Sequence, residues 1–151
     1  MKREENTGFT LEAAYGLAAV EAAKKERMER EINERMERGE DVEPELLTDY
    51  AKVANSYCNA LDLLENYPKE QQQYEKVLAL LTDSESDSME RINVTLATYL
   101  KYAGVLWKQN KYKKTGEALK EALGYMISNI ENLDAERIDK KTLTTQIQHI
   151  S

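Results

Sequence analysis

The chain has 151 residues, an apolar fraction of 41% and a formal net charge of −7. That length suits one soluble domain with a single core. No stretch is apolar enough to cross a membrane and the first residues lack the apolar run of a signal peptide, so we expect a cytoplasmic protein. Only two prolines and six glycines interrupt a sequence rich in helix formers. The predicted fold is therefore all-α, an antiparallel helical bundle or helical-hairpin repeat of five to six helices in one domain.

Charge is distributed unevenly along the chain. Residues 40–90 carry 13 acidic and 3 basic side chains, whereas residues 91–151 carry 6 acidic and 10 basic ones. Affinity for duplex DNA comes largely from clustered lysine and arginine, so an acidic protein with a mildly basic end is not expected to bind DNA in general. Charge of this kind favours solubility and encounters with partners.

The first helix is predicted over residues 10–38. Thr10 is a suitable N-cap, Glu12 lies where the helix dipole favours an anion, and Gly39 is a suitable C′ residue. One apolar stripe with spacings of three and four residues is expected to be buried: Leu11, Tyr15, Ala18 and Ala22.

From Lys24 onward this helix becomes highly charged and keeps only a thin apolar line, Met28, Ile32 and Met36. Two interpretations stay open for this arm. It is either a long solvated helix with one face resting on the domain, or a docking helix that self-associates through these three residues into a homo-oligomer.

The remaining elements follow from proline positions and apolar periodicity. A first helical hairpin is predicted over residues 44–81, with Pro44 at a helix start and Pro68 opening its second helix. Residues 82–88 are polar and predict a loop, with Ser88 as the next N-cap. A second hairpin is predicted over 89–130, and a short helix or tail over 131–151. Gly104 and Gly124 fall inside helical patterns, where close helix packing would explain them.

The two hairpins align when the chain is shifted by 45 residues. Residues of similar character then coincide: Tyr57 with Tyr102, Cys58 with Ala103, Leu61 with Leu106, Tyr67 with Tyr112, Tyr74 with Leu119, Leu78 with Leu123 and Leu81 with Met126. Either an internal duplication or the shared amphipathic pattern of any two hairpins accounts for this match.

Within residues 96–126, the second hairpin resembles a tetratricopeptide repeat. The residues that match that family's pattern are Tyr99, Tyr102, Ala103, Leu106, Tyr112, Leu119 and Ala122. Asn110 stands where the family prefers glycine, Thr115 stands where it prefers alanine, and no proline ends the second helix. The pattern is also similar to the microtubule-interacting-and-transport domain. The resemblance implies binding of a partner's peptide or helix in a groove between helices, without catalysis.

Positive charge and aromatic rings alternate around the turn of this hairpin. The cluster comprises Trp107, Lys108, Lys111, Tyr112, Lys113 and Lys114. An acidic peptide or single-stranded nucleic acid would suit such a surface. The alternative is that Lys108 and Lys111 only complement the dipole of the preceding helix, while Trp107 and Tyr112 belong to the core.

No catalytic, metal or cofactor motif is found. The single histidine, His149, argues against a catalytic triad or a histidine-based zinc site, and no glycine-rich phosphate loop exists. We therefore expect a non-catalytic interaction or adaptor protein that has no cofactor and binds another protein or peptide. The alternative is a small helical subunit of a ribonucleoprotein assembly that contacts nucleic acid through residues 108–114.

Overall fold

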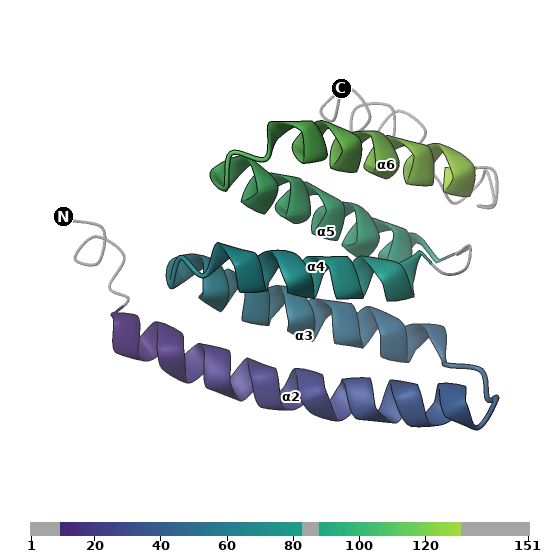
Figure 1. Cartoon of the computed structure of the whole chain (residues 1–151). Coiled ribbons are helices and arrows are strands. Elements are labelled where there is room, and N and C mark those ends of the chain that lie inside the picture. Colours follow the sequence, from purple (N-terminus) through teal and green to yellow (C-terminus); the bar gives the residue numbers. More distant parts are fainter. Residues whose placement is uncertain (1–9, 83–87, 131–151) are drawn as a thin grey trace. The chain divides into compact units, whose positions relative to one another are not determined.

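A computed structural model describes residues 10–82 and 88–130, and these residues form five helices and no strand. The all-α prediction is thus confirmed. The helices are α2 (Leu11–Glu37), α3 (Pro44–Leu63), α4 (Tyr67–Leu81), α5 (Met89–Lys108) and α6 (Tyr112–Ile130) (Figure 1). The predicted loop at 83–87 and the predicted sixth helix or tail at 131–151 lie outside the described residues.

The chain forms two compact units, residues 1–74 and 75–151. In the first unit α2 packs against α3, and in the second α5 packs against α6. Helix α4 contributes its first half to one unit and its second half to the other. The boundary therefore falls inside a helix and not in the predicted 82–88 loop, and the expectation of one domain stays a prediction.

Two predicted N-caps are confirmed by their hydrogen bonds. The Thr10 hydroxyl accepts a hydrogen bond from the Ala13 amide at 3.1 Å, and the Ser88 hydroxyl accepts one from the Arg91 amide at 3.3 Å. Each side chain satisfies an amide that the first turn of a helix leaves without an intrahelical partner. Helices α2 and α5 accordingly begin within one residue of the predicted positions.

Helices α2, α3 and α5 end in the same backbone motif. At each end one residue has positive φ, namely Gly39 (73°), Glu65 (57°) and Asn110 (63°). The amide that follows donates to a carbonyl five residues earlier, at 2.9 Å in all three cases: Glu40 to Arg35, Asn66 to Leu61 and Lys111 to Leu106. This is the Schellman motif, in which glycine is best tolerated and asparagine next. It explains why Asn110 stands where a glycine was expected.

Glu65 is the strained member of this set, because a glutamate has no local hydrogen bond that favours positive φ. We predict that Glu65→Gly raises the free energy of unfolding by about 0.5–1 kcal/mol, measured by urea denaturation. Asn110→Gly is the matched control and should change stability little, since asparagine already adopts this conformation with little strain. A loss of stability in Glu65→Gly would show that the glutamate side chain is needed at this turn.

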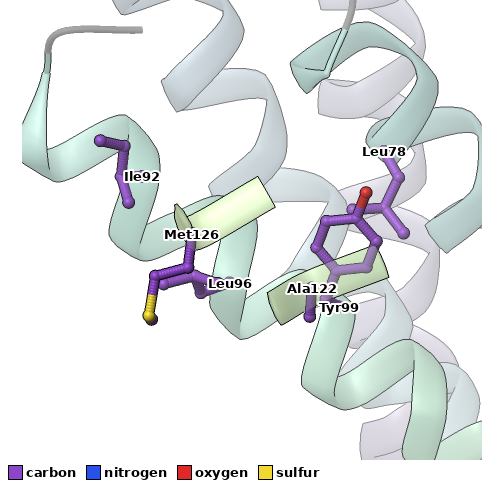
Figure 2. Packing of buried hydrophobic residues seen from close by; sticks show 6 residues of the cluster. All are labelled: Leu78, Ile92, Leu96, Tyr99, Ala122 and Met126. Atoms are coloured by element: carbon purple, nitrogen blue, oxygen red, sulfur yellow. The ribbon is translucent and has the colours of Figure 1, made fainter. Parts of the chain in front are cut away.

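The core of the second unit is built from helix stripes that the sequence pattern anticipates. Tyr99 of α5 lies beside Ala122 of α6 and Leu78 of α4, while Met126 lies beside Leu96 (Figure 2). Ala103, Leu106 and Ala118 form a second cluster nearer the turn. The small residues let α5 and α6 approach closely, and the larger ones fill the space between them.

The predicted buried stripe of α2 is wrong at Leu11 and Tyr15, whereas Ala18 and Ala22 are partly buried. Leu11 and Tyr15 are 50% and 63% exposed, and the residues that α2 buries are Ala14, Lys25 and Ile32. These three are spaced eleven and seven residues apart, so they share one face that is rotated away from Leu11 and Tyr15. Ile32 and the ion pair of Lys25 determine which face meets α3, and the apolar first turns of α2 follow that orientation.

Candidate functional site

The rings of Trp107 and Tyr112 lie at the surface of the α5–α6 turn. Trp107 is 60% exposed and Tyr112 is 53% exposed. Their ring centroids are 4.6 Å apart at an interplanar angle of 63°, an edge-to-face contact. The structure therefore contradicts the interpretation that places these two rings in the core, and it leaves a pair of large aromatic side chains facing solvent.

Hydrogen bonds hold this pair in place. The Tyr112 hydroxyl donates to Oδ1 of Asn110 at 2.8 Å, and the Thr115 hydroxyl donates to the Lys111 carbonyl at 2.9 Å. The four lysines of the predicted cluster, which are Lys108, Lys111, Lys113 and Lys114, are all exposed. The structure thus brings all six predicted partner-binding residues together at one turn.

The turn between α3 and α4 provides an internal comparison. It lies 45 residues earlier, and its helix end, positive-φ residue and helix start all coincide with those of the α5–α6 turn after that shift. Yet Asp62 stands at the position equivalent to Trp107, and Asn66 stands at the position of Lys111. Neither the tryptophan nor the lysine is therefore required to build this turn.

An apolar stripe continues from the turn along both helices. On α5, Leu100, Gly104 and Trp107 are spaced four and three residues apart, so they share one face. On α6, Tyr112, Leu123 and Ile127 also share a face. The contact between the Trp107 and Tyr112 rings joins the two stripes. We call these six residues the hairpin face; its most exposed members away from the turn are Leu100 (47%) and Ile127 (51%).

The opposite edge of the hairpin is occupied by α4. There the Tyr102 hydroxyl donates to Oε2 of Glu75 on α4 at 2.8 Å, and burial together with this bond raises the pKa of Tyr102. Electrostatic interaction with Glu121 and Glu117 raises the pKa of Tyr102 further. The hairpin face is thus the side of α5 and α6 that α4 leaves uncovered.

In the part of the chain that the structure describes, no neighbour packs closely against the glycines of this hairpin. A Cβ added at Gly104 would meet no atom within 4 Å, and the same holds for Gly116 and Gly124. The expected explanation of Gly104 and Gly124 by close helix packing is therefore wrong. Gly104 and Gly116 lie six residues before and six after Asn110, so they flank the turn at equivalent levels of the two helices.

The three residues proposed for self-association do not form one exposed line. Ile32 is fully buried, Met28 is partly buried and lines a shallow hollow with Val53 of α3, and Met36 is 51% exposed. A seam through all three would require Ile32 to leave the α2–α3 interior. Apart from Met36, the large exposed apolar residues of α2 lie in its first turns, at Leu11, Tyr15, Leu17 and Val20.

A buried polar cluster in the first unit was not predicted. Nζ of Lys25 donates to Oε2 of Glu29 at 3.0 Å, and the Tyr50 hydroxyl donates to the same oxygen at 2.7 Å. Lys25 also lies 5.6 Å from the centroid of the Tyr57 ring. Burial, and then the hydrogen bond to Glu29, raise the pKa of Tyr50. The only available signal was the pairing of Lys25 with Glu29 four residues later, which is common on exposed helices.

The described part of the chain offers no metal cluster, since residues 10–82 and 88–130 contain no group of three His, Cys, Asp or Glu side chains that could hold an ion. Among the same residues no helix is both long and apolar enough to span a bilayer. Comparison with protein-family models, curated proteins and solved structures gives no match.

Proposed function

We propose that this chain is a non-catalytic, cytoplasmic interaction or adaptor protein that binds another polypeptide through the second helical hairpin. One observation supports this most directly, which is the exposed pair of Trp107 and Tyr112 among lysines. Aromatic side chains are enriched at the energetically important centres of protein interfaces, because each buries a large area on binding. The equivalent turn at 62–67 has the same backbone without the tryptophan, so folding alone does not account for it.

The resemblance of residues 96–126 to a tetratricopeptide repeat agrees with this proposal, since that family binds peptides with helical surfaces. Recognition of a helix in an apolar groove uses side chains spaced three and four residues apart, which is the spacing of the hairpin face.

Affinity capture from extract of the source cells tests the proposal. The full-length chain should recover one protein in about equimolar amount, and the double variant Trp107→Ala, Tyr112→Ala should lose it. The control double variant Tyr15→Ala, Val20→Ala removes exposed apolar side chains from α2 instead, and it should retain the partner. Equal recovery by wild type and both variants, or recovery of nothing, would contradict binding through this turn.

The second candidate is a helical subunit of a ribonucleoprotein assembly. Exposed rings on which bases stack and lysines beside them are the features of single-strand binding surfaces. If this candidate holds, Lys111→Glu combined with Lys114→Glu should abolish RNA binding, and affinity should fall steeply with salt. Unchanged affinity, or no affinity in the wild type, would exclude it.

A further inference from the structure

We propose that the partner segment taken up by the hairpin face is an acidic amphipathic helix. This inference rests on the proposed function, and it specifies the chemistry of the partner. Its starting point is a face of α5 and α6 that is apolar, uncovered by α4, and bordered mainly by lysines.

The border of the face is basic on α5, and on α6 it includes Lys113 and Lys120. Residues 91–116 contain six basic side chains and no acidic one. On α5, Lys101 and Lys108 follow Leu100 and Trp107 by one residue each, so they lie along the flank of the apolar stripe. On α6, Lys120 lies seven residues before Ile127 and therefore beside it. Glu117 follows Lys113 by four residues and precedes Lys120 by three, so one carboxylate lies between these two lysines on α6.

Two glycines leave the backbone of α5 and α6 open to close approach by a docked helix. Gly104 and Gly116 are both exposed, and each lowers helix stability by up to about 1 kcal/mol relative to alanine. Among residues 10–82 and 88–130, nothing packs against these two positions, because an added Cβ would meet no neighbour. A helix that docks between α5 and α6 would approach these positions most closely, with the rings of Trp107 and Tyr112 beside one end.

Charge argues against residues 140–151 of this chain as the occupant. Residues 140–151 contain two lysines and no acidic side chain, although Leu143, Ile147 and Ile150 follow an amphipathic spacing. Such a segment would bring positive charge to a lysine border. A helix with leucine-like residues on one side and glutamate or aspartate on both flanks would satisfy the apolar stripe and the lysines together.

Trp107 is the only tryptophan of the chain, so its fluorescence reports directly on this face. The probe is a synthetic helical peptide of about 18 residues, roughly 27 Å long, without tryptophan. It carries leucine at every third or fourth position and glutamate on both flanks, and a twin peptide carries lysine in place of each glutamate. Titration of the full chain with the glutamate peptide should shift the Trp107 emission to shorter wavelength and reduce quenching by acrylamide. The lysine twin should do neither.

Two substitutions localise the effect. Lys113→Glu should lower the affinity for the glutamate peptide by about five- to tenfold, because it reverses a charge at the border of the hairpin face. Lys69→Glu makes the same charge change at an exposed position of α4 and should leave the affinity unchanged. Gly104→Leu should also weaken binding of the glutamate peptide, because the leucine side chain blocks close approach of a helix. It should raise helix stability at the same time, so weaker binding could not be explained by unfolding.

Several results would overturn the inference. These are no response to the glutamate peptide, an equal response to the lysine twin, or a stronger response to poly-uridine or to vesicles of phosphatidylglycerol. Failure here is distinguishable from failure of the proposed function. A partner captured through Trp107 and Tyr112 whose cross-linked segment lacks acidic side chains would leave the function in place and reject only the acidic helix.

Discussion

Replacing Glu29 by glutamine should lower the free energy of unfolding by about 3 kcal/mol, because it breaks a buried ion pair and leaves the other charge behind. The Lys25 side chain is 6% exposed and that of Glu29 is 16% exposed, so water replaces the lost carboxylate poorly. The Tyr50 hydroxyl also loses the charged acceptor at 2.7 Å. Urea denaturation followed by circular dichroism measures the change.

The control lies on the same helix. Glu31 and Arg35 form an ion pair with the same four-residue spacing at 3.1 Å, with side chains that are 51% and 28% exposed. Glu31→Gln should therefore change stability by less than about 0.5 kcal/mol. Lys25→Met added to Glu29→Gln should restore much of the loss, because it removes the unpaired buried charge while the glutamine carbonyl still accepts the hydrogen bond from Tyr50. Equal effects of Glu29→Gln and Glu31→Gln would contradict the burial argument.

Ile32→Asp should unfold the first unit. The side chain is fully buried in α2, so the substitution removes apolar burial and introduces a carboxylate away from water. Each effect is large, and together they exceed about 4 kcal/mol. The expected result is loss of helical signal at 25 °C and a lower melting temperature.

Met36→Asp distinguishes unfolding from dissociation. Met36 is 51% exposed on the same helix, so an aspartate there should leave stability within about 0.5 kcal/mol of wild type. If α2 self-associates through Met28, Ile32 and Met36, then Met36→Asp should lower the mass in solution while the helical signal is retained. A folded Ile32→Asp variant would contradict the position of Ile32 in the α2–α3 interior.

Helix bounds are the part of this fold that the sequence predicts well. Prolines, caps and a positive-φ glycine act over a few residues, so Pro44, Ser88 and Gly39 mark their helix ends without knowledge of the neighbours. Which face of a helix is buried depends on its neighbours. Helix α2 is apolar nearly all round in its first turns, and periodicity alone therefore assigned Leu11 and Tyr15 to the wrong side.

The sequence identifies which residues belong to the candidate site, but it does not decide whether Trp107 and Tyr112 face solvent or the core. The alternation of lysines and rings around residue 110 is visible in the sequence, and it identifies the turn. Whether Trp107 points inward depends on how α5 rotates against α6, which Leu96, Ala103 and Leu106 determine by filling the interior. The hydrogen bond between Tyr102 and Glu75 joins residues 27 positions apart, so no local sequence pattern predicts it.

Helix α4 belongs to both units. Its 15 residues are divided between them at Tyr74, so each unit depends on about half of a helix that continues into the other. Helical segments of seven or eight residues do not persist alone in water, because nucleation is unfavourable and few bonds follow it. We therefore expect that melting of either unit also destabilises the other half of α4, so that unfolding is cooperative across the boundary at Tyr74.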